Sequence, residues 1–234
     1  MDLWGLSATD RVGEDLYYNS KGEYLKTVAN GTASVYLSEN GKTTYVGSQT
    51  DFEIMTAALY GEGTINLEEM QAIGDAIMNR VNASNSSASI EIKKPKQVKG
   101  YNLTSINAVS KGRFSNDDAK LITARNASIK TMLGESNGKS NGAYWWDGAD
   151  IVITDPEDKY FNYERRKDGF TILPEHNIYN IENVLTDEII EYYETGIEKS
   201  RYDHIYESTA AVGGTIFWKK SPGYKKASNG KEYP

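Results

Sequence analysis

Two features that many secreted and membrane proteins have, cysteine and a long apolar run, are missing from this sequence. The 234 residues contain no cysteine, which excludes disulfides and thiolate chemistry. No run approaches the ~20 apolar residues of a membrane-spanning helix, so we expect no membrane span. The first residues, MDLWGLSATDRVGEDLYY, contain neither a basic nor an apolar region of the kind found in a Sec signal peptide.

Basic charge and histidine are also scarce. The chain has 26 Lys and Arg residues against 33 Asp and Glu residues, a net charge of −7. A nucleic-acid-binding protein needs a basic face that displaces counterions, so we expect no nucleic-acid partner. The two histidines, His176 and His204, lack the spacing of a zinc peptidase site, and the acidic stretch DGADIVITDPED lacks that of a calcium loop. With no P-loop or dinucleotide fingerprint either, the sequence predicts no metal and no cofactor.

Aromatic residues, by contrast, are abundant. The chain has 17 tyrosines and 4 tryptophans. Aromatic faces stack well on sugar rings, although most of these residues also suit a strand or a core. Hydrophobic residues make up 38% of the chain, which is sufficient for one large domain, or for one domain with a small appendage.

The residue pattern predicts an α+β fold that is mainly helical. Residues 15–47 have the character of short strands, and Asn40-Gly41 is the strongest hairpin signal because both central residues of a type I′ turn need positive φ. From Thr50 onward, capping residues and apolar positions at spacings of three and four indicate helices. The predicted helices are residues 51–60, 66–82, 103–110, 115–133 and 186–196, and the rest of 82–112 is predicted to be a polar loop.

The last third of the sequence contains further strand signals. Residues 151–154 predict a strand, and STAAVGGTIFWKK predicts a strand or hairpin with a glycine bend. The last residues, SPGYKKASNGKEYP, are typical of a flexible tail. We therefore divide the chain into an N-terminal β segment (1–49), a main domain (50–220) and a tail (221–234).

One local pattern, Tyr60-Gly61-Glu62-Gly63, sets a carboxylate between two glycines at the end of a predicted helix. A carboxylic acid in a cleft lined by aromatic groups is desolvated, which raises its pKa, so it can act as a general acid. The glycines would allow a sharp turn and the close approach of a substrate. From spacing alone, the alternative is that Gly61 ends the helix and that Glu62 is a solvated loop residue.

The segment around this pattern, AALYGEGTINLEEMQAIGDAIMNRV, resembles the signature of the spore-cortex-lytic type of cell-wall hydrolases. In that family a helix ending in Tyr-Gly/Ala-Glu precedes a helix ending in Asn-Arg-Val. Three later segments are similar to the family in the same order: GRFS (112–115), NGAYWWDGAD (141–150) and TAAVGGTIFWK (209–219). The resemblance implies a lysozyme-like fold and cleavage of peptidoglycan between N-acetylmuramic acid and N-acetylglucosamine, often as a lytic transglycosylase.

The resemblance also implies roles for individual residues. Glu62 is the expected catalytic acid. The expected substrate-binding residues are Tyr60, Arg113, Phe114, Ser115, Tyr144, Trp145 and Asp147. The chain departs from the family in the three residues after Glu62, Gly-Thr-Ile in place of Ala-Arg-Gly, and also at Arg113 and Thr215, where the family has glutamine and histidine.

A second carboxylate distinguishes two kinds of glycan cleavage. A hydrolytic muramidase needs one as base or nucleophile, and the candidates are Glu68, Glu69, Asp75 and, as the favoured one, Asp147. Glu68 and Glu69 also fit charge matching at a helix N-terminus, and Asp75 is expected to be solvated. A lytic transglycosylase needs only Glu62, because the muramyl C6 hydroxyl attacks intramolecularly. A glycan-binding module without turnover is a third interpretation.

A cell-wall enzyme without a signal peptide would be secreted, or delivered to the envelope or periplasm, by a route other than Sec. A type VI secretion system or a phage lysis or tail apparatus would serve, and the β segment 1–49 would then be a docking or loading element, or an extension of the fold. If the enzyme is an antibacterial toxin, we expect a dedicated immunity protein that plugs its cleft. In each case the expected substrate is the peptidoglycan glycan strand.

Overall fold

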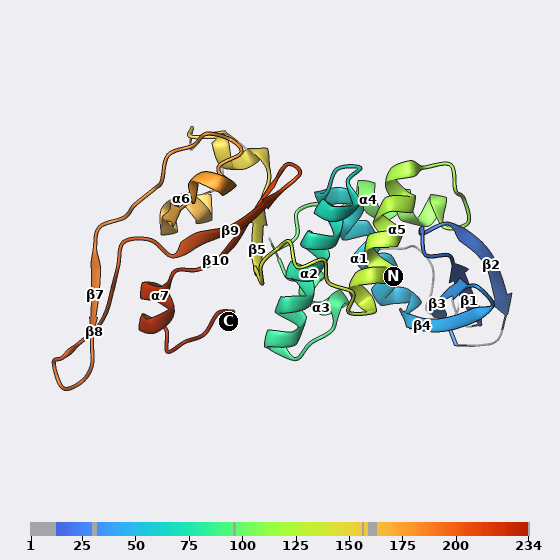
Figure 1. Ribbon diagram of the computed structural model, residues 1–234, viewed down its shortest axis with the longest axis horizontal. Coiled ribbons are helices and arrows are strands. Elements are labelled where there is room, and N and C mark those ends of the chain that lie inside the picture. Colours follow the sequence, from blue (N-terminus) through green and yellow to red (C-terminus); the bar gives the residue numbers. More distant parts are fainter. Residues whose placement is uncertain (1–12, 30–31, 96, 156, 159–162, 234) are drawn as a thin grey trace. The chain divides into compact units, whose positions relative to one another are not determined.

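The computed structural model has the α+β class that the sequence predicts. It describes residues 13–29, 32–95, 97–155, 157–158 and 163–233. The chain divides into two units, residues up to 137 and residues 138–234 (Figure 1). The predicted main domain therefore includes residues of both units. The prediction that a Sec signal peptide is missing depends largely on positions 1–12. These positions lie outside the described residues.

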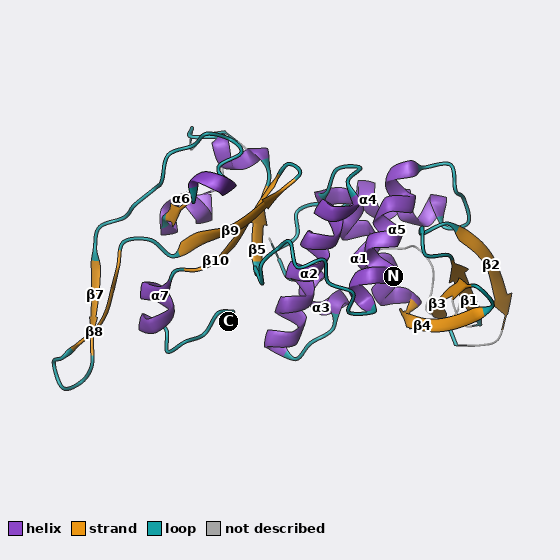
Figure 2. Ribbon diagram, in the orientation of Figure 1, coloured by secondary structure: helices purple, strands orange, loops and turns teal. Residues whose placement is uncertain are grey.

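The first unit consists of a four-stranded sheet followed by helices (Figure 2). The strands follow one another in space in the order β2-β1-β3-β4. Their bounds are β1 (Glu14–Tyr18), β2 (Tyr24–Ala29), β3 (Ser34–Glu39) and β4 (Lys42–Ser48). The helices are α1 (Gln49–Glu62), α2 (Leu67–Ser84), α3 (Ala88–Lys93), α4 (Leu103–Gly112) and α5 (Ala119–Met132).

The N-terminal sheet is built into the helical unit. The turn predicted at Asn40-Gly41 joins β3 to β4, and the φ angles of 52° and 76° are positive, as a type I′ turn requires. Apolar side chains of the sheet pack against α1 and α5 in one core, formed by Leu16, Tyr18, Val35, Val46, Phe52 and Ile129. The sheet therefore shares one core with the helices, and whether it also serves in docking or loading stays a prediction.

The helix starts follow from capping side chains. Ser48 accepts a hydrogen bond from the backbone N–H of Asp51, so α1 begins before the predicted cap at Thr50. Asn66 caps α2 as predicted. Helix α3 lies in a segment predicted to be loop: Ser87 caps it, and its buried Ile92 packs in the unit. A six-residue helix shows too little apolar periodicity to be recognised from sequence.

The second unit contains short strands and short helices, with η denoting a 3-10 helix. Its elements are β5 (Trp145–Asp147), η2 (Ala149–Val152), α6 (Tyr163–Asp168), β6 (Phe170–Thr171), η3 (Pro174–His176), β7 (Ile189–Tyr192), β8 (Glu198–Tyr202), β9 (Tyr206–Val212), β10 (Thr215–Lys220) and α7 (Pro222–Ala227). One sheet has the order β5-β10-β9-β6, and β7 and β8 form a separate hairpin. Within this unit the hairpin extends away from the larger sheet (Figure 1). The core consists of Ile151, Phe170, Ile172, Ile216 and Trp218.

The predicted helix over residues 186–196 is wrong. The segment contains β7, which pairs antiparallel with the following strand β8, and Gly196 lies in the turn between them with a φ of +78°. Thr186, predicted to cap a helix, donates its hydroxyl to the backbone oxygen of Asp203 at 2.8 Å. β-branched and aromatic residues favour a strand when a partner strand is present, and the partner lies beyond the local window.

The predicted strand at residues 151–154 is also wrong. Ala149–Val152 is a 3-10 helix that buries Ile151 completely, and the strand lies just before it, at β5. Apolar residues in a short run are consistent with either state, and core packing decided between them. The hairpin predicted from STAAVGGTIFWKK is confirmed as β9 and β10, with Gly213 at a φ of +59° in the turn.

The C-terminal segment is not the uniformly flexible tail that its composition predicts. It contains α7, which lies against β8 because Ser200 donates its hydroxyl to the backbone oxygen of Gly223. Lys199 donates to the backbone oxygen of Ala227 at 2.6 Å. Among the residues that the structure describes, no helix has the length and apolar character needed to cross a membrane.

Candidate functional site

Glu62 is the last residue of α1, where the helix leaves the protein interior. The preceding residues from Phe52 to Leu59 are buried, and Glu62 is half-buried. Its Oε1 accepts a hydrogen bond from the backbone N–H of Gly100, in the loop between α3 and α4. A backbone donor has little freedom to move, so this bond fixes the direction of the carboxyl group.

The glycines around Glu62 allow the chain to approach itself. A Cβ on Gly61 would lie 1.8 Å from the backbone oxygen of Gly100, and a Cβ on Gly100 would lie 2.4 Å from the backbone nitrogen of Glu62. A Cβ on Gly63 would lie 2.6 Å from the side chain of Met70 on α2. The glycines are predicted to let a substrate approach closely. Beside Gly61, the loop that holds Glu62 makes this close approach instead.

The loop that carries Gly100 is fixed by the first turn of α4. Ser105 is buried, and its hydroxyl donates to the backbone oxygen of Gly100 at 2.7 Å. The same hydroxyl accepts from the backbone N–H of Asn102 at 3.1 Å, as part of the capping box that begins α4. Gly100 lies 38 residues after Glu62 in the sequence. The position of the Glu62 carboxyl group therefore depends on how the distant helix α4 begins.

Tyr60 lies two residues before Glu62 and contacts α5. Its hydroxyl donates to Asp118 Oδ2 at 3.1 Å, and Lys120 Nζ lies 5.0 Å from the centroid of its ring. Burial, together with the neighbouring Asp118, raises the pKa of Tyr60. The ring also packs with Tyr101 on the apolar cluster between α1, α4 and α5. Tyr60 therefore has a structural role at the same end of α1 as the candidate acid.

Arg113, Phe114 and Ser115 follow α4 and have different environments. Arg113 Nε lies 2.7 Å from Glu53 Oε1, and only 11% and 2% of these two side chains are exposed. Phe114 is 53% exposed, and its ring lies edge-on against Tyr24 of β2 at a centroid distance of 5.4 Å. Ser115 is half-buried. Of these three predicted substrate-binding residues, Phe114 thus presents an exposed apolar surface, whereas the Arg113 side chain is directed into the protein and pairs with Glu53.

A buried ionic cluster beneath these residues was not predicted. Glu53 accepts a hydrogen bond from Gln49 Nε2 at 3.1 Å in addition to its pair with Arg113. Arg125, 1% exposed, donates to the backbone oxygens of three residues of the 112–115 segment. Its guanidinium group lies 5.2 Å from the ring centroid of Tyr18, and burial raises the pKa of Tyr18. The available sequence signal was a charged residue within an apolar helix, as at Glu53.

The candidates for a second carboxylate in this unit have structural partners. Glu69 is 1% exposed and accepts hydrogen bonds from the backbone N–H and hydroxyl of Thr64, which closes the turn between α1 and α2. Asp75 was expected to be solvated, and this is wrong. It is 7% exposed and accepts a hydrogen bond from the Ser136 hydroxyl at 2.6 Å. Glu68 is exposed in the first turn of α2.

The remaining predicted site residues, Tyr144, Trp145 and Asp147, belong to the second unit. The ring of Tyr144 stacks on Tyr233 with centroids 5.9 Å apart. Asp147 is 9% exposed, and its Oδ2 accepts a hydrogen bond from Arg165 Nε at 2.8 Å. These contacts explain the residues as parts of the second unit, and their role in substrate binding stays a prediction.

Comparison with known proteins adds no assignment, because no protein-family model, no curated protein and no solved structure matches the chain. Within the described residues, no group of three or more His, Cys, Asp and Glu side chains is arranged to hold a metal ion. The features that bear on function are therefore the environment of Glu62 and the sequence segments that resemble those of cell-wall hydrolases.

Proposed function

We propose that the chain cleaves the glycan strand of peptidoglycan, as a lytic transglycosylase with Glu62 as general acid and base. The observation that carries the proposal is the fixed carboxyl group at the end of a buried helix, held by the N–H of Gly100. A general acid must be held within hydrogen-bonding reach of the oxygen that it protonates, and a rigid support meets that requirement.

In the proposed reaction, Glu62 donates its proton to the glycosidic oxygen between the two sugars. The bond from that oxygen to C1 of N-acetylmuramic acid breaks, and N-acetylglucosamine leaves with a free hydroxyl. The Glu62 carboxylate then takes the proton of the muramyl C6 hydroxyl, whose oxygen bonds to C1. The product has a 1,6-anhydro end, no water is consumed, and the proton returns to Glu62.

The hydrolytic alternative would require a second carboxylate that activates water. The buried candidates Glu69, Asp75 and Asp147 each accept hydrogen bonds from groups of their own unit, which favours the mechanism with a single glutamate. In either mechanism the exposed ring of Phe114 offers a surface on which a sugar can stack.

The test compares products from purified peptidoglycan. Wild-type protein and a Glu135→Gln control, in which an exposed glutamate of the same unit is changed, should release 1,6-anhydromuropeptides detected by mass spectrometry. Glu62→Gln should release none, while its amide oxygen still accepts from Gly100 and the protein remains folded. Reducing-end products would establish a muramidase. No products from folded wild-type protein would reject the enzyme in favour of a glycan-binding module.

The location and partners follow from this proposal. Peptidoglycan as substrate would place the protein outside the cell or in the envelope or periplasm. If it acts there as an antibacterial toxin, production in the periplasm of a sensitive cell should cause lysis, and Glu62→Gln should abolish that lysis. An immunity protein would then be recognised as a protein encoded by an adjacent gene that restores growth and blocks the release of muropeptides in vitro.

A further inference from the structure

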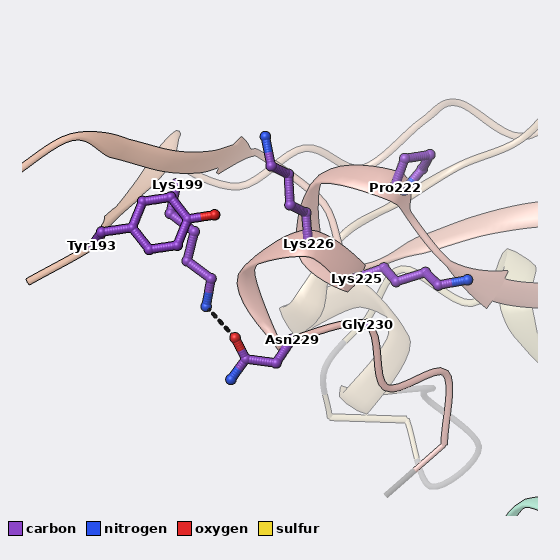
Figure 3. A pocket seen from close by; sticks show the side chains of 7 residues that line it. All are labelled: Tyr193, Lys199, Pro222, Lys225, Lys226, Asn229 and Gly230. Atoms are coloured by element: carbon purple, nitrogen blue, oxygen red, sulfur yellow. Dashed lines mark hydrogen bonds between the residues drawn. The ribbon is translucent and has the colours of Figure 1, made fainter.

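A hollow of about 610 Å³ in the second unit lies between the β7–β8 hairpin and α7 (Figure 3). Its size falls in the range of small-molecule sites. The polar residues that line it are three lysines, a tyrosine and an asparagine: Lys199, Lys225, Lys226, Tyr193 and Asn229. Among the described residues, those that line this hollow include no Asp or Glu.

The two walls of the hollow are fastened to each other. The turn before β8 is closed by a hydrogen bond from the backbone N–H of Tyr193 to the backbone oxygen of Ile197 at 2.9 Å. Lys199 reaches across to α7 and donates to the backbone oxygen of Ala227 at 2.6 Å and to Asn229 Oδ1 at 2.7 Å (Figure 3). The hairpin and helix therefore form one preorganised surface.

The side chains facing this surface offer hydrogen-bond donors. Because Asn229 Oδ1 accepts from Lys199, its Nδ2 group points the other way and can donate to a ligand. An ammonium group has three N–H donors, and Lys199 uses two of them within the chain. Lys226 is exposed and extends from α7 in a different direction from Lys225 (Figure 3). Tyr193 adds a hydroxyl and a half-exposed ring.

Two acidic residues near the hollow form ion pairs, one with a lysine that lines the hollow and one with an arginine outside it. Glu232 pairs with Lys225, and Glu198 Oε2 lies 3.1 Å from Arg201 Nη2. A hydrogen bond from Arg201 and, to a smaller extent, the charge of Lys226 lower the pKa of Glu198. The neighbouring carboxylates therefore do not neutralise Lys226 by direct pairing in the described part of the chain.

We propose that this hollow binds an anionic group, a carboxylate or phosphate, that is attached to a ring or other apolar part packing on Tyr193. Lys199 and Asn229 would donate to the anion, and the charge of Lys226, which also lines the hollow, would attract it. The lactyl carboxylate of N-acetylmuramic acid is such a group where the stem peptide is absent, because in intact peptidoglycan it is amide-linked to that peptide. This choice of ligand, a peptide-free muramyl residue, rests on the proposed function. The hollow would then add substrate binding without taking part in bond cleavage.

The test is a titration of the full ¹⁵N-labelled chain followed by NMR. The probes are N-acetylmuramic acid, N-acetylglucosamine, which lacks the lactyl carboxylate, and inorganic phosphate. We expect the amide signals of Tyr193, Lys226 and Asn229 to shift with N-acetylmuramic acid and not with N-acetylglucosamine. A response to phosphate alone would keep the anion site and reject the muramyl ligand. An equal response to both sugars, or none to any probe, would overturn the proposal.

Matched variants make the test specific. Lys226→Glu should weaken the affinity for N-acetylmuramic acid about tenfold, because it replaces attraction to the anion by repulsion. Lys42→Glu, which changes an exposed lysine of the first unit, should bind like wild type. Unchanged binding by a folded Lys226→Glu variant would reject the site. Glu62→Gln should retain this binding. The NMR titration therefore reports on the anion site, and the release of products from peptidoglycan reports on the proposed catalysis, so the failure of one can be told from the failure of the other.

Discussion

Glu53 and Arg113 form a buried ion pair in the first unit, and Asp147 and Arg165 form one in the second, but their surroundings differ. Glu53 also bonds to Gln49, so polar groups support the first pair. In the second, the guanidinium group of Arg165 lies 3.8 Å from the ring centroid of Tyr206. Arg113 also lies near a ring, but at 5.9 Å from the centroid of Phe114, so the closer aromatic contact belongs to the second pair and the additional side-chain hydrogen bond from Gln49 to the first.

The two units also differ in how they hold the side chains proposed to have a function. In the first, hydrogen bonds and close backbone contacts fix a single carboxyl group, Glu62. In the second, rings and lysine stems line an open hollow whose donors face solvent. The first arrangement suits proton transfer at one atom, and the second suits binding of a charged group.

Arg113→Ala should produce the largest loss of stability. Removing the guanidinium group leaves the Glu53 carboxylate, 2% exposed, without its cation, and breaking a buried pair in this way typically destabilises by about 3–5 kcal/mol. Urea unfolding measures the effect. Arg201→Ala, which removes an exposed pair with Glu188, is the control and should leave the unfolding midpoint almost unchanged. Similar losses in the two variants would contradict the buried network.

Gly61→Ala should destabilise the first unit by about 1–3 kcal/mol, because the added Cβ meets the backbone of Gly100. The sign is decisive, since glycine to alanine within a helix ordinarily stabilises by about 1 kcal/mol. Gly148→Ala is the control, because its Cβ would have no neighbour closer than 3.9 Å. A gain of stability in Gly61→Ala would show that the loop does not lie against α1.

Ser105→Ala should have the smallest effect on stability, about 1–2 kcal/mol, because it removes the hydrogen bonds of the Ser105 hydroxyl to the Gly100 oxygen and from the Asn102 N–H. Because Ser105 positions Gly100 and thereby Glu62, kcat for product release should fall while the KM for peptidoglycan stays near the wild-type value. Ser228→Ala removes a serine hydrogen bond to a backbone oxygen in the second unit and should leave kcat unchanged. If kcat is unchanged in both variants, Ser105 does not position the acid.

Local patterns predicted much of the first unit. Helices α1, α2, α4 and α5 and the Asn40-Gly41 turn were found because capping residues, positive φ and apolar periodicity act within a few neighbouring residues. The second unit was less predictable. Residues 186–196 are predicted to be a helix but contain β7 and the turn before β8, since strand pairing depends on a partner rather than on local preference.

The candidate site shows the same division. Glu62 stood out in the sequence through its flanking glycines, and its catalytic role stays a prediction. Gly100 and Ser105 gave no sequence signal, because their importance comes from a contact across 38 residues. Arg113 was expected at a substrate surface, and the inward pair with Glu53 was visible only once α1 and the segment after α4 were packed together.

Neighbouring residues are enough to specify the α+β class, most helices of the first unit and the carboxylate at the end of α1. Tertiary structure alone decided why Gly61 must lack a side chain, which backbone group holds Glu62, and which lysines share a hollow with Tyr193. These features need segments distant in sequence to meet, and the meeting is set by burial of apolar surface in each unit rather than by local conformational preference.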